Sequence, residues 1–305
     1  MSLIKNKKDI YVAGAVLGML AGLLWGFSGT FGQFLFDTRG FDAVWLTSTR
    51  MVFAGIIMLA ICAAKYGKGI FDIWKDKQSR FDIIIYAVFC MAGVQVTYFT
   101  SIQYSNAATG TIIQYTGSAI VVVWVAMRAR RLPNKFESSA VICAILGIFL
   151  ISTHGKPDAL VLSPFALIVG LISACMMAGY SIQPKRMLEK HGTLKVNGWG
   201  IFLGGVFMSI FRPPWELGGG NLDFYAVLAT IGVIVLGTIL SFLCYMEAVR
   251  IIGSTHAVLY ACVEPLSSAV ITIVWFKIEF GLIDWVGALL IISTVFIISR
   301  APRNT

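Results

Sequence analysis

The stretch STHAVLYACVEPLSSAVITIVWFKIE, residues 254–279, places an ionisable residue, Glu264, beside Pro265 in the middle of an apolar segment. If this segment crosses a bilayer as a helix, a rise of about 1.5 Å per residue puts Glu264 roughly 15 Å from its inner end, near the midplane. Carboxylates are costly there and tend to mark a site or a pathway. Pro265 lacks a backbone donor and crowds the preceding turn, so it predicts a bend and a carbonyl that needs another partner.

The composition of the whole chain is that of a membrane protein. Of its 305 residues, 58% are hydrophobic and 13% are charged, and the mean hydropathy is +0.82. Soluble domains carry about 25% charged residues. The six cysteines all fall inside apolar runs, which indicates small buried hydrophobes rather than disulfides or metal ligands. We expect no cofactor, and the sequence contains no phosphate-binding loop, hydrolase motif or zinc-protease motif.

With about 20 apolar residues per crossing, the sequence predicts an all-α integral membrane protein with ten transmembrane helices. The weakest boundary separates the third and fourth helices, because no charge occurs between Ile83 and Met127 and only Tyr104–Asn106 offers a turn. The first apolar run is too long for a signal-peptide core, so we interpret it as a retained span. The predicted spans are 11–36, 44–66, 83–105, 107–127, 138–155, 165–187, 196–212, 223–250, 254–276 and 281–299.

The basic residues set the predicted orientation. Counted in alternate loops, nineteen of the 24 Lys and Arg lie on the side of both termini and four on the other, with Arg50 left inside a helix. By the positive-inside rule, both termini are cytoplasmic, and we expect a multi-pass protein of the plasma (inner) membrane. The net charge of +9 is dispersed over short loops as an orientation signal, which argues against nucleic acid as a partner.

A weak internal repeat occurs at a displacement of 147 residues. It aligns Tyr98 with Tyr245 and Glu137 with Asp284 without a gap, and it superposes the third to fifth spans on the eighth to tenth. Because five is odd, the second half would cross in the opposite sense, which predicts two inverted five-helix repeats with a substrate site between them. The predicted divisions are a cytoplasmic N-terminus 1–10, a first repeat 11–155, an extracytoplasmic linker 156–164, a second repeat 165–299 and a cytoplasmic C-terminus 300–305.

Short motifs follow one another in a fixed order along these spans. They are Leu24-Trp25-Gly26, Arg50, Tyr245-x-x-Ala248, Ser254-Thr255-His256-Ala257, Glu264-Pro265, Glu279 and Gly287. Their order and spacing, with two sets of five spans, resemble the EamA-type branch of the drug/metabolite transporter superfamily over nearly the whole chain. The resemblance implies a transporter, usually an exporter of amino acids or similar small metabolites, with a central cavity between the halves.

The first half of the chain departs from the family pattern. At the displacement of 147, Gly117-Ser118 stands where the second half has Glu264-Pro265. Arg130-Arg131 stands where the family usually ends its fourth span with an acidic residue. The two halves are therefore chemically unequal, and we expect one dominant carboxylate rather than a symmetric pair.

Three formal charges fall within the predicted spans, away from loop ends. Glu264 fits a substrate-amine or proton site, or else a neutral buried acid or a partner of Arg50 that locks the fold; we favour the site. Arg50 fits a bidentate clamp for a substrate carboxylate, or else a tie to carbonyls or to Glu264; we favour the tie. Glu247 stands three residues before Arg250, a spacing that suits a local ion pair.

Aromatic and amide side chains away from the predicted interfaces form a second group of site candidates. They suit ring contacts and charge pairing with a small zwitterionic or aromatic metabolite, and interhelical packing is an equal alternative for each of them. His154 and His256 stand near predicted helix ends and are expected to be solvated. The full candidate set for the substrate or proton site is Glu264, Arg50, Tyr98, Gln114, Tyr115, Tyr180, Tyr245, Tyr260 and Trp25.

The sequence thus predicts a secondary transporter and not an enzyme. It would carry a small-molecule substrate across the lipid bilayer by alternating access around a midplane cavity. Protons are the candidate coupling ion, and downhill facilitation is equally compatible. A translocator of lipids or lipid-linked substrates is the first alternative, and an intramembrane enzyme, which would need an ionisable or metal-binding cluster, is the second. The oligomeric state is left open.

Overall fold

The computed structural model describes residues 7–128, 130–156 and 162–300, and every regular element in these ranges is helical. Eight helical stretches are long and apolar enough to cross a membrane, and Pro164–Tyr180 is a shorter apolar helix. The all-α prediction is thereby confirmed for the described ranges, whereas the count of ten crossings is not. Much of the predicted tails and linker, and the side chain of His256, lie outside the described residues.

The helices of the first half begin mostly at Asp or Asn residues. Asp42, Asp76, Asn106 and Asn134 each accept a hydrogen bond from the backbone N–H three residues later, which satisfies an otherwise unpaired amide of the first turn. The elements are α1 (Lys7–Arg39), α2 (Ala43–Tyr66), the 3-10 helix η1 (Gly67–Trp74), α3 (Lys77–Ile85), the π-helix η2 (Tyr86–Ala92), α4 (Gly93–Gln103), α5 (Ala107–Tyr115), α6 (Gly117–Arg128) and α7 (Lys135–Thr153).

The second half follows a similar order of helices. Asp223 caps its third long helical segment in the same way as the Asp and Asn caps of the first half. The elements are α8 (Pro164–Ile182), α9 (Lys185–His191), α10 (Thr193–Met208), α11 (Phe224–Ile234), the π-helix η3 (Val235–Leu240), α12 (Ser241–Ala261), α13 (Val263–Phe276) and α14 (Leu282–Ser299). In the described residues, this half adds the short helix α9, has no counterpart of η1, and has one helix, α12, where the first half has α4 and α5.

The turn between α4 and α5 confirms the boundary predicted at Tyr104–Asn106. α4 ends at Gln103, and the Asn106 side chain accepts a 2.8 Å hydrogen bond from the Thr109 N–H to start α5. A cap of this kind stabilises the start of a helix by about 1 kcal/mol. In a stretch without charges, the capping residue was therefore the informative signal.

Helix α12 is helical throughout but not straight. A methyl group on Gly18 of α1 would lie 3.8 Å from the Ala248 side chain and 3.3 Å from the Ala257 carbonyl oxygen. Nine residues of straight helix span about 13.5 Å, so the axis must turn back between Ala248 and Ala257. Both arms of α12 thus pack against α1. The predicted helix ends at 250 and 254 are not found, because Ser241–Ala261 form one helix.

Two predicted spans are interrupted near their middle. The span 107–127 breaks at Thr116, and the span 254–276 breaks at Cys262. The expectation of one continuous helix over 107–127 was wrong, because hydropathy reports burial and not backbone continuity. The break at Cys262 lies close to Pro265, where the sequence predicts a bend. Pro265 lies in the first turn of α13, where the helix itself needs no backbone donor, but the Ala261 carbonyl of α12 is left without the donor that residue 265 would otherwise supply.

Backbone features recur at the displacement of 147 residues. α3 begins at Lys77 and α11 at Phe224, and each of these helices continues into a π-helix, η2 or η3, before α4 or α12. Arg130 and Lys277 both adopt the left-handed conformation, with φ of 49° and 54°. The displacement seen in the sequence is therefore also present in the backbone.

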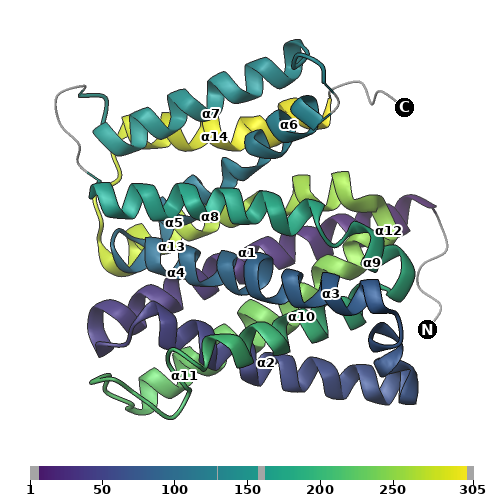
Figure 1. The fold of residues 1–305 in the computed structure, drawn as a ribbon. Coiled ribbons are helices and arrows are strands. Elements are labelled where there is room, and N and C mark those ends of the chain that lie inside the picture. Colours follow the sequence, from purple (N-terminus) through teal and green to yellow (C-terminus); the bar gives the residue numbers. More distant parts are fainter. Residues whose placement is uncertain (1–6, 129, 157–161, 301–305) are drawn as a thin grey trace.

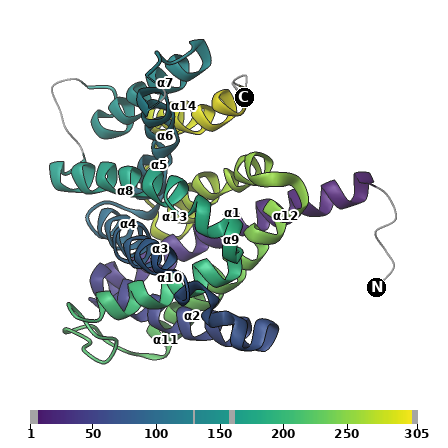
Figure 2. The ribbon, with the colours of Figure 1, turned by 45° about the vertical axis from the view of Figure 1, so that its right-hand side comes forward.

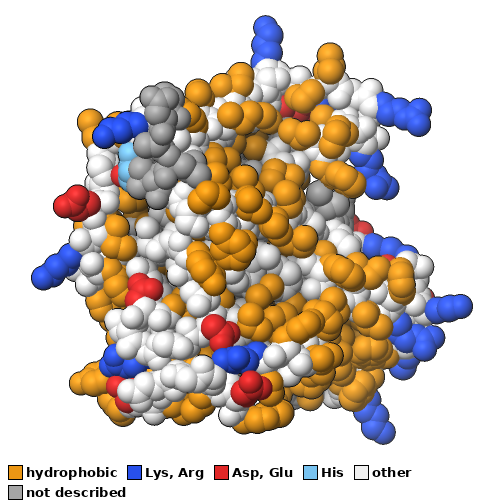
Figure 3. Space-filling view, turned by 60° about the vertical axis from the view of Figure 1, so that its left-hand side comes forward, with side chains coloured by type: hydrophobic (Ala, Val, Ile, Leu, Met, Phe, Trp, Pro, Cys, Tyr) orange, Lys and Arg blue, Asp and Glu red, His pale blue; other side chains and the backbone are white. Residues whose placement is uncertain are grey.

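Helices from opposite halves are interleaved. α1 packs against α11–α13, α8 against α4–α6, α2 against α10 and α7 against α14. Figures 1 and 2 show α7 and α14 side by side at one margin of the bundle and α2, α10 and α11 at the opposite margin, with α1, α4, α5, α8 and α13 between them. α1 begins and α14 ends at the same edge in Figure 1. Figure 3 shows a broad hydrophobic surface with Lys and Arg projecting at its margins, as a lipid-facing wall requires.

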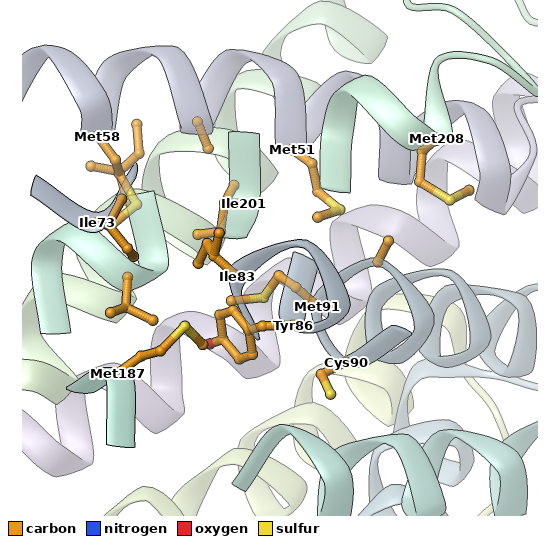
Figure 4. Close-up of a cluster of buried hydrophobic side chains, with 14 of the residues drawn as sticks. Met51, Met58, Ile73, Ile83, Tyr86, Cys90, Met91, Met187, Ile201 and Met208 are labelled. Atoms are coloured by element: carbon orange, nitrogen blue, oxygen red, sulfur yellow. The ribbon is translucent and has the colours of Figure 1, made fainter. Parts of the chain in front are cut away.

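The largest buried apolar cluster joins the two halves beside α2. Met51 and Met58 of α2 pack with Tyr86 of η2, Met187 of α9 and Ile201 of α10 (Figure 4). Flexible methionine side chains fill irregular gaps between helices that meet at different angles. This cluster fixes α2, which carries Arg50, relative to the second half of the chain.

Candidate functional site

A cavity of about 210 Å³ lies between the two halves of the chain. Pockets for drug-sized ligands measure roughly 300 to 1,000 Å³, so this cavity suits a smaller molecule. Side chains of α1, α2, α4–α6, α8 and α12–α14 contribute to its walls. Eight of the nine candidates from the sequence line it: Trp25, Arg50, Tyr98, Gln114, Tyr115, Tyr180, Tyr245 and Glu264.

Tyr260 is the candidate that the structure places elsewhere. Its ring packs edge-on against Tyr11 of α1, with ring centroids 6.4 Å apart, and it is not among the residues that line the cavity. Tyr260 stands four residues before Glu264, which would put the two on one face of a continuous helix. The break at Cys262 separates them, so the spacing argument fails.

Arg50 is buried and faces the cavity, and no described carboxylate forms an ion pair with it. It is 3% exposed, and its guanidinium lies over the Phe99 ring, 5.0 Å from the centroid. Its Nε has no hydrogen-bond partner, and no carboxylate of the described residues lies within 4.0 Å of the group. The tie that we favoured from the sequence is therefore not found in the described part of the chain. Arginine stays charged when buried, so this side chain is free to receive an anionic group.

Glu264 lies in the first turn of α13 and is 8% exposed. Its Oε2 accepts a hydrogen bond from the Tyr115 hydroxyl at 3.0 Å, and the same hydroxyl lies 3.2 Å from the Ala261 carbonyl oxygen. A helix N-terminus favours a negative charge. Among the described residues the carboxyl group thus has one side-chain partner, Tyr115 of the first half, and it faces the same cavity as Arg50.

Aromatic rings form much of the remaining wall. The Trp25 ring lies 5.3 Å from Tyr245 and 5.5 Å from Phe242, measured between centroids. Tyr180 stacks on Tyr86 at 5.8 Å, and the Tyr86 hydroxyl donates to Asn197 at 2.8 Å. Rings held in this way present flat surfaces to an apolar group or a cation.

Short hydrogen bonds orient two polar side chains of the cavity. The Gln114 amide donates to the Ser173 hydroxyl at 2.8 Å, and the hydroxyls of Tyr98 and Thr111 lie 2.9 Å apart. Each bond joins neighbouring helices, α5 with α8 and α4 with α5. Packing and cavity lining, which the sequence left as equal alternatives, are therefore combined in these residues.

The sequence reasoning missed several lining residues, among them Ser28, Met177, Ser118 and Phe242. The internal repeat offered a signal for one of them, since the displacement of 147 places Phe242 opposite Gln95, and both line the cavity. Small and apolar side chains such as Ser28 carry no comparable signal in the sequence.

The expectations for Glu247 and His154 can also be compared with the structure. Arg250 Nε donates to Glu247 Oε2 at 2.8 Å, which confirms the predicted local ion pair. His154 is not simply solvated: its Nδ1 lies 2.5 Å from Oδ1 of Asp284, which is buried near the start of α14. The expectation of a solvated His154 holds in part, since its side chain is 42% exposed, but the sequence did not reveal its partner, which lies 130 positions away.

Polar clusters connect the halves at both ends of the bundle. At one end, Arg39 pairs with Asp223 at 3.0 Å and Arg212 with Asp42 at 2.9 Å. At the other end, a second polar cluster joins the start of α3 to α9. This α3–α9 cluster consists of Asp76, Ser79, Lys190 and His191. Lys190 Nζ lies 2.8 Å from Asp76 Oδ2, and Ser79 Oγ lies 2.9 Å from His191 Nε2.

Hydrogen bonding keeps two acidic members of these clusters, Asp76 and Asp223, ionised. Bonds from Lys190 and from Ser79 hold the pKa of Asp76 well below its usual value. The Ala226 N–H, and after it Arg39, lower the pKa of Asp223. Both carboxylates therefore stay charged at neutral pH, and neither changes its charge in the physiological range.

The fold and the lined cavity define a polytopic membrane transporter. Residues 12–153 and again residues 164–300 match the EamA-like transporter family, and the chain belongs to this family. It is 35% identical to the "Uncharacterized inner membrane transporter YicL" of Salmonella typhimurium over 94% of this chain and 95% of that protein. The chain is accordingly a multi-pass protein of the plasma (inner) membrane.

More distant similarities agree with this membership. The chain is 21% identical to the "Uncharacterized transporter YcbK" of Bacillus subtilis over 72% of this chain and 70% of that protein. It is also 21% identical to an "Uncharacterized transporter" of Archaeoglobus fulgidus over 89% and 92% of the two chains. A crystal structure with 12% identity covers 94% of this chain and 96% of its own, with a TM-score of 0.64. That last likeness concerns the fold alone.

Proposed function

We propose that this protein is a secondary transporter that exports small zwitterionic metabolites, such as amino acids, by alternating access around the cavity. The observation that carries the proposal is the pair of opposite charges, Arg50 and Glu264, which line one aromatic cavity without forming an ion pair among the described residues. The export direction is taken from the family resemblance.

The proposed recognition assigns one charge of the substrate to each residue. The guanidinium of Arg50 would bind the carboxylate, for which its fork of N–H donors is suited. The Glu264 carboxylate would bind the ammonium group, and the rings of Trp25 and Tyr245 would enclose the side chain. A molecule that lacks either charge leaves one buried charge unpaired, which is a strong basis for discrimination.

Glu264 is also the proposed proton site. A buried carboxyl that binds either a proton or an ammonium group allows the proton gradient to drive export, because the two cations compete for one position. Arg50 stays charged and cannot play this part. The asymmetry between the halves, with Gly117 opposite Glu264, supports a single coupling carboxylate.

The proposed membrane topology has ten crossings in two inverted repeats, 11–155 and 165–299, with both termini in the cytoplasm. In this arrangement α8 and α10 are crossings as well. The recurrence of backbone features at 147 residues supports it, as do the two successive family matches and the shared edge of α1 and α14. The distribution of Lys and Arg supports the cytoplasmic location of the termini.

Reconstitution into vesicles tests the proposed function. Purified protein would be supplied with labelled amino acids, amines, nucleosides and a fluorescent phospholipid, and movement would be followed with and without a pH gradient. We expect at least one amino acid to move faster than through protein-free vesicles, and the imposed gradient to accelerate it. Movement of the phospholipid without any zwitterion would contradict the proposal and favour a lipid translocator.

A further inference from the structure

We propose that the Tyr115 hydroxyl is a positioning group that transmits the state of Glu264 to the helix break at Cys262. The inference rests on the proposed role of Glu264 as the site of a proton or an ammonium group. Its geometric basis is that one hydroxyl lies within hydrogen-bond distance of two acceptors, Glu264 Oε2 at 3.0 Å and the Ala261 carbonyl at 3.2 Å.

The Ala261 carbonyl lies at a special position in the backbone. In a continuous helix it would accept a hydrogen bond from residue 265, but Pro265 has no N–H to donate. On another side the carbonyl packs against α1, because a methyl group on Gly22 would lie only 2.5 Å from its oxygen. Tyr115 is the described side chain that donates to this carbonyl at the break.

A tyrosine hydroxyl has one hydrogen, so it donates fully to one acceptor at a time. When Glu264 is ionised, the charged carboxylate attracts that hydrogen more strongly, since hydrogen bonds to ionised acceptors are roughly twice as strong. The Ala261 carbonyl then loses its donor. A buried carbonyl without a hydrogen bond is destabilising, so the break is less stable in this state.

When Glu264 takes up a proton from the cavity, the hydrogen bonds can be rearranged. The protonated carboxyl donates to the Tyr115 oxygen, and Tyr115 turns about its C–O bond to donate to Ala261, so that all three groups are satisfied. A substrate ammonium bound to Glu264 has the same effect, because it neutralises the carboxylate and releases Tyr115. Proton and substrate thus stabilise the same arrangement, and the empty, ionised site does not.

The bond also crosses between the two halves. Tyr115 ends α5, next to the break at Thr116, whereas Ala261 and Glu264 flank the break at Cys262. The other ionisable groups that face this cluster are Arg50, Tyr98, Tyr245 and Cys262. Tyr98 is bonded to Thr111, and among the described residues none of the four donates to Glu264 or Ala261. Occupation of Glu264 therefore controls a contact at the point where the halves meet.

Hydrogen–deuterium exchange of the segment 258–266 tests this inference without a transport assay. Wild type, Tyr115→Phe and a control, Tyr104→Phe, share the sequence of this segment, so intrinsic exchange cancels at each pH. Tyr104 is exposed in the α4–α5 turn. Relative to Tyr115→Phe, we expect wild type and the control to gain about fivefold in protection as the pH falls, the effect of one hydrogen bond of about 1 kcal/mol.

A second variant keeps the test decisive if Tyr115→Phe does not fold. The amide of Glu264→Gln can donate to the Tyr115 oxygen in the manner of a protonated carboxyl, so its protection should be high and independent of pH. Exchange that matches wild type in either variant at every pH would overturn the inference. Failure of zwitterion transport with an intact exchange pattern would contradict the proposed substrate and leave the Tyr115 switch standing.

Discussion

Arg50 and Glu264 are the residues on which the proposed recognition depends, and they differ in how much the sequence revealed. Glu264 stands out because an acid beside a proline in an apolar stretch has few structural explanations. Arg50 stands out equally, yet the sequence could not tell a structural tie from a binding group. That choice depends on which side chains surround it, and the structure places Phe99 and the cavity there.

Loss of the Glu264 charge should abolish most transport. For Glu264→Gln we expect a decrease of at least about thirtyfold in the initial rate of zwitterion transport, because one charge of the bound substrate is left unpaired, at a cost of about 2 kcal/mol or more. Glu247→Gln is the matched control, since Glu247 pairs locally with Arg250. Initial rates in vesicles check this prediction, and equal losses in the two variants would contradict it.

The α3–α9 cluster provides a prediction for the pH dependence of thermal stability. The pKa of Asp76 is lower in the folded protein than its unfolded value of about 3.9. The stabilisation is therefore complete above about pH 5 and decreases as the pH falls through the unfolded and then the folded pKa. Asp76→Asn should lower the melting temperature at pH 7, and the difference from wild type should shrink at lower pH.

Lys190→Gln is the partner variant for this prediction. Because Lys190 and Asp76 form one ion pair, the double variant should melt no lower than the less stable single variant. Additive losses in thermal unfolding in detergent would show that the pair does not act as a unit.

At the scale of helices, the sequence indicated the turn at Asn106 and a bend at Pro265 but not the break at Thr116. Asn106 marked the start of α5 in a stretch without charges, because its side chain satisfies a free amide. The break at Thr116 leaves no comparable mark in the sequence. The break at Cys262 separates Tyr260 from the helix face of Glu264, so the predicted position of Tyr260 in the cavity was wrong. Such breaks depend on contacts between helices, which a window of hydropathy along one helix does not contain.

The close approach of α1 to the break at Cys262 gives a prediction for packing. A methyl group on Gly22 would lie 2.5 Å from the Ala261 carbonyl oxygen and 3.1 Å from the Glu264 nitrogen. Both are backbone atoms and cannot rotate away, so Gly22→Ala should cost roughly 1 to 3 kcal/mol of stability and should displace α1 from the site.

Gly179→Ala is the control for that substitution. On Gly179 of α8 the nearest atom to an added methyl group is Cys90 Sγ at 3.7 Å, an ordinary contact. We expect this variant to be neutral or slightly more stable, since alanine is the better helix former. Thermal unfolding of Gly22→Ala and Gly179→Ala measures the difference in stability. Equal melting temperatures of the two variants would refute the packing argument.

For the whole molecule, composition alone established the class, and the internal repeat indicated where the halves meet. The displacement of 147 residues was weak in sequence identity but recurs in helix starts and in the left-handed residues Arg130 and Lys277. The interleaving of helices, with α1 packed on α11–α13 and α8 on α4–α6, could not be read from the sequence. It follows from which faces fit together in three dimensions.

The proposed topology predicts which loops face each side of the membrane. Single cysteines would replace exposed residues in a chain whose native cysteines are changed to alanine. At Lys68 and Lys135, an impermeant thiol reagent should label inverted vesicles. At Glu216 and Lys156, it should label right-side-out vesicles. Labelling of all four positions from one side would contradict the ten-crossing arrangement.

The central claim is that Arg50 and Glu264 bind the two opposite charges of one small substrate. Its most direct test compares phenylalanine with phenethylamine, which lacks the carboxylate, and 3-phenylpropionate, which lacks the ammonium group, as competitors of zwitterion transport in vesicles. Wild type should be inhibited by phenylalanine at least about tenfold more strongly than by either analogue, since each lost pairing costs more than about 1.4 kcal/mol. In Arg50→Gln the advantage of phenylalanine over phenethylamine should disappear. Equal inhibition of wild type by all three molecules, or an unchanged preference in Arg50→Gln, would contradict the account.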